Sequence, residues 1–123
     1  MKVLRTPCEC FDNLKDYSFK ENYITIPIAD DVTARMHYVD ENSDSSDVVL
    51  LLHGEPTWSY LYRHMIPILA KAGKRVIAPD LIGFGKSDKL SERTDYTYER
   101  HVAWTRNIIE QLNLTNITFF GQD

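Results

Sequence analysis

Residues 48–56 read VVLLLHGEP, five apolar residues followed at once by a polar turn. The apolar part has no polar alternation, which is typical of a strand covered on both faces in a parallel sheet. Val76–Ala78 and Ile117–Phe120 are two further short runs of the same kind. Together the three runs predict a sheet with a buried core.

Helical patterns separate these runs. Residues 59–72 carry apolar side chains at helical spacing, with Gly73 placed to stop the helix and Pro67 expected to kink it or begin its second half. A second helix is predicted from about Thr97 to Leu112. The face expected to be apolar consists of Tyr98, Val102, Thr105, Ile108, Ile109 and Leu112.

The region before residue 48 predicts a hairpin. Tyr23–Ile28 and Thr33–Val39 are rich in strand-forming residues, and the acidic pair at residues 30–31 suits the turn between them. The first twenty residues lack periodicity, which indicates an irregular arm. Strands that then alternate with helices predict an α/β fold, with a mixed, mostly parallel sheet that opens with an antiparallel hairpin.

Composition argues against several classes of protein. The formal net charge is −4 and the basic residues are scattered, so the basic patch of a nucleic-acid binder is missing. The longest purely apolar run, Val48–Leu52, is far shorter than the roughly 20 residues of a membrane span. No export signal is recognisable, which predicts a cytoplasmic protein. We expect a small, uncharged partner, with no nucleic acid and no membrane.

The two cysteines, Cys8 and Cys10, are separated by a single residue. This spacing is too tight for an unstrained disulfide, and no second Cys or His cluster could complete a zinc site. They are interpreted as free thiols in a reducing compartment. Neither a metal nor a cofactor is expected.

Asp123 follows the third apolar run directly after Gly121 and Gln122. Such a strand end suits a sharp turn that lifts one side chain above the sheet. A free aspartate titrates near ~3.9, so this carboxylate would be ionised at neutral pH and could attack carbon without a base. An N-cap for a following helix is the structural alternative, which this context alone leaves open.

The His53-Gly54-Glu55-Pro56 turn follows the first apolar run. Loops in this position supply a main-chain N–H to an oxyanion hole, and here the donor would be the N–H of Glu55. His53 is more simply explained as a hydrogen-bonded structural residue. The role of the Glu55 side chain stays open.

The loop after the second run contains Gly85-Lys86-Ser87, the tail of a phosphate-binding motif. That motif needs glycine five residues before Gly85, where Asp80 stands, so the match fails. Asp80 and Asp88 are therefore interpreted as structural acids of the turns. Four aromatic residues are assigned to packing, the first less firmly because it follows the Glu55 turn: Trp58, Tyr60, Tyr62 and Trp104.

Three motifs taken together resemble those of the haloalkane dehalogenases. They are the turn and helix start at residues 53–63 (HGEPTWSYLYR), the APDLIGFGKSD stretch at residues 78–88, and the strand that ends in Gly121-Gln122-Asp123. The similarity runs over nearly the whole chain. It implies the N-terminal portion of an α/β-hydrolase fold, with residues 1–123 forming part of the main domain and the cap domain and C-terminal half absent.

The resemblance also implies a mechanism and its residues. Asp123 would be the nucleophile that displaces halide from a haloalkane and forms an alkyl ester, which an activated water then hydrolyses to the alcohol. The N–H of Glu55 would be one oxyanion donor, and Glu55 and Trp58 would be candidate substrate contacts. The partners implied are a small haloalkane, water and halide, for a bacterial-type enzyme that is a monomer at full length.

The family's base histidine, partner acid and halide-binding tryptophans are expected beyond residue 123, so the segment alone is predicted to be inactive. Three alternatives remain. An epoxide hydrolase would usually have Gly-His-Asp at the nucleophile, where Gln122 stands here, and a serine esterase would have serine in place of Asp123. A non-catalytic hydrolase-like binding or complementation module would be indicated by a disrupted turn after Asp123.

Overall fold

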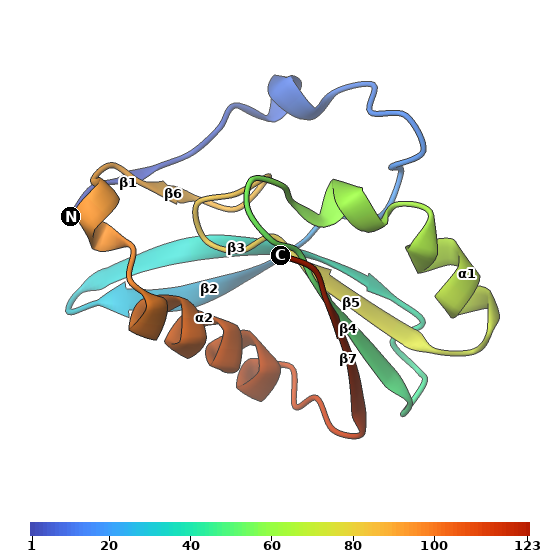
Figure 1. The fold of residues 1–123 in the computed structure, drawn as a ribbon. Helices are drawn as coiled ribbons and strands as arrows, with labels where there is room; N and C mark the ends of the chain where they lie inside the picture. The colour runs from blue at the N-terminus through green and yellow to red at the C-terminus, as the bar shows by residue number, and fades with distance from the viewer.

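The computed structural model describes residues 1–123 and contains a five-stranded mixed sheet (Figure 1). The strands are β2 (Asn22–Ala29), β3 (Val32–Glu41), β4 (Val48–Leu52), β5 (Arg75–Pro79) and β7 (Ile117–Gly121), in the spatial order β2-β3-β5-β4-β7. Strand β3 is antiparallel to both of its neighbours, whereas β4 is parallel to β5 and to β7. Four strands therefore share one direction, which confirms the predicted mixed sheet and its opening hairpin.

Two α-helices cover opposite faces of this sheet: α1 (Met65–Lys71) and α2 (Tyr98–Gln111). Strand β4 shows the two faces clearly, because side chains alternate across a strand. Val48 and Leu50 belong to the apolar cluster on the α2 side, and Val49 and Leu51 belong to the cluster on the α1 side. The prediction that this strand is covered on both faces is confirmed.

Strand β7 differs from the prediction. Its place in the sequence is as expected, but every one of its residues is exposed, with Phe119 at 61%. The reason is its position, since β7 is an edge strand and neither helix lies over it (Figure 1). The apolar side chains of β7 are therefore not covered by any other part of residues 1–123.

The predicted helix at residues 59–72 is divided. Residues Ser59–Tyr62 form a 3₁₀ turn, and the α-helix begins only at Met65. Pro67 lies in the first turn of α1, where a missing N–H costs no hydrogen bond. Pro67 therefore begins the second half of the helix predicted at residues 59–72, and it does not kink a continuous helix. Gly73 ends the helix with φ +87° and donates its N–H to Ala70 O.

Helix α2 is capped as its sequence suggests, because the Thr97 hydroxyl accepts the N–H of Arg100 at 3.1 Å. The apolar face was predicted only in part. Trp104 and Ile108 are buried, while Tyr98 is 81% exposed. Ile109 and Leu112 of the predicted face are partly buried against the same core. Tyr98 and Val102 face outwards.

The N-terminal arm is mostly irregular, as predicted, with a 3₁₀ turn at Cys8–Phe11. It also forms a two-stranded pairing between β1 (Val3–Leu4) and β6 (Lys89–Leu90) that the pattern did not reveal. Arg5 reinforces the pairing through two hydrogen bonds of 2.7 and 3.0 Å to the Asp88 carboxylate. Cys8 and Cys10 are free and exposed, which agrees with the interpretation above.

Neither α-helix has the length and apolar character that crossing a membrane would need.

Candidate active site

The candidate site lies where β4 and β7 end. The two strands are parallel neighbours, with Leu52 in register with Gly121. The N–H of Gln122 continues the pairing by donating to Leu52 O at 3.2 Å. The turn after β4 and the residues after β7 therefore leave the sheet side by side, as carboxyl ends of parallel strands do.

Gly54 is the point at which the two segments meet. A methyl group on its Cα would lie 2.2 Å from the main-chain carbonyl carbon of Asp123 and 2.5 Å from Gln122 O. Only a residue without Cβ allows this approach. The structure thus brings Asp123, which is exposed, against the turn that carries Glu55.

Glu55 presents an open donor beside Asp123. Its main-chain N–H donates to no group of the chain, and its peptide bond to Pro56 is cis. Its side chain is exposed and borders a cavity of about 410 Å³. The other residues that line this cavity are Gly83, Phe84, Arg93, Tyr96 and His101. An anion at this turn would find an unoccupied N–H.

His53 is buried and has both ring nitrogens engaged. Its Nε2 accepts the N–H of Leu81 at 3.0 Å, so the proton lies on Nδ1, which donates to Gly54 O at 2.8 Å. Burial lowers the pKa of His53 below its ordinary value, and the bond to Gly54 only partly opposes this. The neutral ring ties the Glu55 turn to the loop after β5. The structural interpretation of His53 is confirmed.

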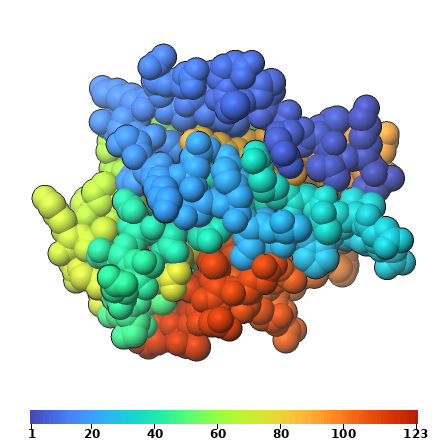
Figure 2. All heavy atoms as spheres, turned by 180° about the vertical axis from the view of Figure 1, so that it is seen from behind, coloured from blue at the N-terminus to red at the C-terminus, as the bar shows by residue number.

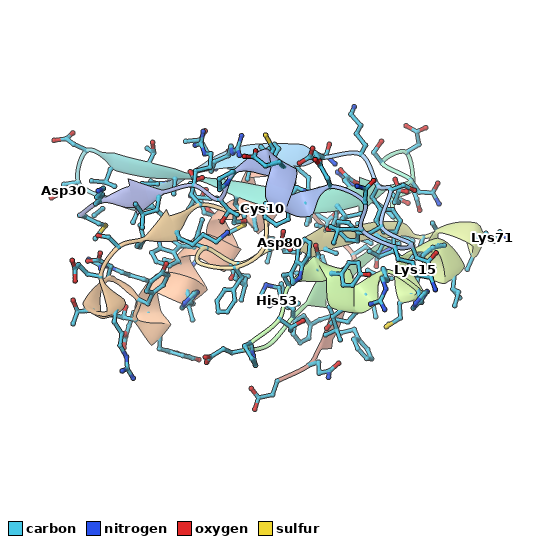
Figure 3. All side chains as sticks on the ribbon, turned by 90° about the horizontal axis from the view of Figure 1, so that it is seen from above. Cys10, Lys15, Asp30, His53, Lys71 and Asp80 are labelled. Carbon is cyan, nitrogen blue, oxygen red and sulfur yellow. The ribbon has the colours of Figure 1, made fainter.

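Asp80 is the buried charge beneath the site (Figure 3, where His53 and Asp80 are labelled). Its carboxylate accepts the N–H of Ser59 at 2.7 Å, the N–H of Lys86 at 3.0 Å and the Nδ1 of His37 at 2.9 Å. Burial alone would raise the pKa of Asp80, but these hydrogen bonds outweigh it and hold the pKa below its usual range. Asp80 is therefore structural, as predicted, with a larger set of partners than a turn residue has.

No sequence pattern indicated His37, the partner of Asp80, which lies in the middle of β3 among apolar residues. Ser87 completes the network, because its hydroxyl donates to Asp80 O at 2.6 Å and accepts the N–H of His37 at 2.8 Å. The N–H of Lys86 and the hydroxyl of Ser87 are thus used in hydrogen bonds within the fold, in agreement with the rejection of a phosphate loop.

Trp58 lies in an aromatic cluster beneath the N-terminal arm. Its ring is 5.3 Å from that of Tyr17, 5.6 Å from that of Phe11, and stacked at 5.5 Å on Tyr60. Neither Trp58 nor Asp123 is among the residues that line the cavity at Glu55. The structure places the main chain of Asp123 against Gly54, the neighbour of Glu55, and a substrate contact of Trp58 stays a prediction.

Comparison with known proteins gives a consistent result. Residues 47–123 match the family described as the α/β hydrolase fold. Over all 123 residues the chain is 58% identical to a haloalkane dehalogenase of Psychrobacter cryohalolentis and covers 41% of that protein. The tetrameric haloalkane dehalogenase DpaA of Paraglaciecola agarilytica superposes with a TM-score of 0.93 at 47% identity, covering 100% of this chain and 41% of the other.

A solved epoxide hydrolase of Vigna radiata is also similar, with a TM-score of 0.74 at 27% identity over 85% of this chain and 32% of the other. The chain spans 41% of the length of the curated haloalkane dehalogenases that it resembles.

Gly54→Ala is predicted to destabilise the protein by about 2–3 kcal/mol, because the new methyl group meets main-chain atoms that cannot rotate away. Gly73→Ala is the matched control. It meets no atom within 4 Å and should cost only about 1 kcal/mol for its positive φ. Urea unfolding of both variants measures the difference, and equal losses would contradict the close approach at Gly54.

Stability is predicted to fall at mildly acidic pH. The pKa of His53 is lower in the folded chain than its ordinary 6.5, so the unfolded chain binds the proton first. The free energy of unfolding should fall as pH drops below 6.5, by up to about 1.4 kcal/mol per pH unit from this group.

Urea unfolding between pH 7 and 5 measures this slope. Burial also lowers the pKa of His101, so His53→Gln should remove only part of the slope. His64→Gln, at an exposed histidine, should leave it unchanged. A slope that survives His53→Gln at its full value would contradict the assignment.

Proposed function

This chain belongs to the α/β-hydrolase fold family, and from that premise we propose that the protein hydrolyses haloalkanes to an alcohol and a halide through an ester of Asp123. The observation that supports this most directly is the contact between Gly54 and the main chain of Asp123. Glu55, whose N–H donates to no group of the chain, directly follows Gly54, and this supports its assignment as the oxyanion donor. The named dehalogenase relatives from two bacteria support the same reaction.

The first step forms the ester. A carboxylate oxygen of Asp123 attacks the carbon that carries the halogen, the new C–O bond forms as the carbon–halogen bond breaks, and the halide leaves with the electron pair. No proton is needed, because the nucleophile is already an anion and the leaving group is stable as one. An aspartate therefore suits this substrate better than a serine.

The second step regenerates the enzyme. Water, deprotonated by a base, adds to the ester carbonyl carbon, and the negative charge moves to the carbonyl oxygen. The N–H of Glu55 would stabilise that oxyanion. Collapse of the tetrahedral intermediate then breaks the carbonyl carbon–oxygen bond, and the alcohol leaves with the oxygen that Asp123 had supplied.

The base of the second step is proposed to lie outside residues 1–123. His53 has both ring nitrogens bonded, and His37 is buried against Asp80. His64 is exposed beside α1, and His101 packs against the rings of Tyr96 and Trp104.

An epoxide hydrolase is the alternative within the same family. It would use the same nucleophile and the same N–H, and the similarity to the Vigna radiata enzyme shows that this fold serves both reactions. Gln122 favours the dehalogenase, because it occupies the position before the nucleophile where the epoxide hydrolases usually have histidine. Diol formation from styrene oxide without halide release from 1-bromobutane would reverse this choice.

Asp123→Ala in the full-length protein is predicted to abolish bromide release from 1-bromobutane, by at least about 10⁴-fold. Asp31→Asn, in the exposed turn between β2 and β3, is the control and should retain full activity.

A single turnover in H₂¹⁸O tests the ester itself. The label should enter the Asp123 carboxylate, and the first equivalent of alcohol should contain ¹⁶O. Label in the alcohol and none in Asp123 would instead mean that water attacks the substrate directly.

Purified residues 1–123 alone should show no turnover, because an ester of Asp123 could not be hydrolysed without the base of the second step, which is proposed to lie elsewhere together with the covering of the site. Bromide in excess of one equivalent per chain, above the spontaneous rate, would contradict this. The matched comparison is the full-length protein at equal concentration, assayed with the same substrate.

A further inference from the structure

A second cavity, of about 500 Å³, lies beneath the N-terminal arm and shares no lining residue with the cavity at Glu55. The arm, the β2–β3 hairpin and the loop after β5 form its walls. Figure 2 shows this side of the molecule, with the blue arm above the hairpin and gold atoms of the chain after β5 visible between them. Nothing in the proposed reaction uses this cavity.

Lys86 supplies one positive charge to the cavity. Its side chain is only 9% exposed, and its ammonium lies over the rings of Tyr17 and Phe11, at 5.3 and 5.7 Å from their centroids. The nearest carboxylate is that of Glu21, at 3.5 Å. This distance is longer than that of a strong charge-assisted hydrogen bond, so the ammonium keeps donors to spare.

Arg35 supplies a second charge and has no acidic partner for its side chain. The guanidinium carbon lies over the Tyr23 ring, 3.8 Å from its centroid, and Nε is buried without a hydrogen-bond partner. The main chain of Arg35 is fixed, since its N–H donates to the Asp88 carboxylate at 2.8 Å and its carbonyl accepts the N–H of Asp88. The two terminal nitrogens of the guanidinium make no hydrogen bond to the chain and are not buried, so they are available to an acceptor in the cavity.

The remaining charges at this cavity are mostly compensated. Arg5 is neutralised by its two bonds to Asp88. Glu21 is the one acidic residue of the lining, and its carboxylate lies 3.5 Å from the ammonium of Lys86. The Tyr23 hydroxyl also donates to Glu21 at 2.6 Å, so part of that carboxylate is already used. The lining therefore has an excess of positive charge.

We propose that this cavity binds a small organic acid, with its carboxylate on Arg35 and Lys86 and its apolar body against Phe11 and Pro7. A guanidinium fork matches the planar carboxylate in two hydrogen bonds. The volume lies within the range of ordinary small-molecule sites. A doubly charged phosphate fits less well, because the Glu21 carboxylate would repel it. The site is independent of the reaction proposed above.

Benzoate is the probe, titrated into the full-length protein and followed by calorimetry. It should bind at one site, and acetate should bind at least about tenfold more weakly because it lacks the apolar body. Benzyl alcohol, which has the ring without the charge, should not bind. Tighter binding of inorganic phosphate than of benzoate would overturn the choice of ligand.

Arg35→Gln should weaken benzoate about tenfold or more, and Lys86→Met should weaken it by a similar factor. Arg106→Gln, at an exposed arginine of α2, is the matched control and should change nothing. Glu21→Gln should tighten benzoate, because it removes the repelling carboxylate from the lining. If Arg35→Gln disturbs folding, the tighter benzoate binding expected of Glu21→Gln still tests the proposal.

Unchanged benzoate affinity in both Arg35→Gln and Glu21→Gln would overturn the proposal, as would the absence of benzoate binding to the unmodified protein. Halide release serves as the separate readout. It should persist in Arg35→Gln if the proposed function is correct, so failure of one proposal does not imply failure of the other.

Discussion

A carboxylate with no exposed surface needs hydrogen bonds in place of the water it has lost, and Asp80 obtains them from three separate segments. His37 comes from the hairpin, Ser59 from the turn before α1, and Lys86 from the loop after β5. Displacing any of these segments would leave a buried charge short of a donor. The hairpin, the turn before α1 and the loop after β5 are consequently held together by one buried carboxylate.

The candidate site depends on this arrangement. The turn that carries Glu55 is anchored at its start, where His53 accepts the N–H of Leu81, and at its end, where Ser59 donates to Asp80. Between these two anchors the chain can hold Glu55 with a free N–H. The register of β4 and β7 then sets Asp123 against Gly54. Ordinary structural bonds thus hold the turn of Glu55 and the segment of Asp123 next to each other.

Local patterns were sufficient to predict the five strands of the main sheet and the existence of both helices, and they missed the pairing of β1 with β6 and the late start of α1. The run at residues 48–52 was correctly assigned as a doubly covered strand, because its composition reflects burial on both faces. The run at residues 117–120 is also mostly apolar but lies at the sheet edge, where its phenylalanines are exposed. No pattern within either segment distinguishes these two positions.

The side-chain network was beyond prediction for a related reason. Asp80 was recognised as a structural acid of a turn, yet its partner His37 lies 43 residues earlier in an apolar strand. Pairing of that kind depends on topology rather than on spacing. The juxtaposition of Asp123 and Glu55 was accessible only because parallel strands bring their carboxyl ends to one edge.

The pairing of β1 with β6 has a consequence for biosynthesis. Val3 and Arg5 are synthesised before residues 88–90 and must wait for them before they find these partners. At ordinary translation rates this interval is roughly 4–17 s. During it the thiols of Cys8 and Cys10 lie on a segment that this pairing does not yet hold. A segment made early is thus secured by one made much later.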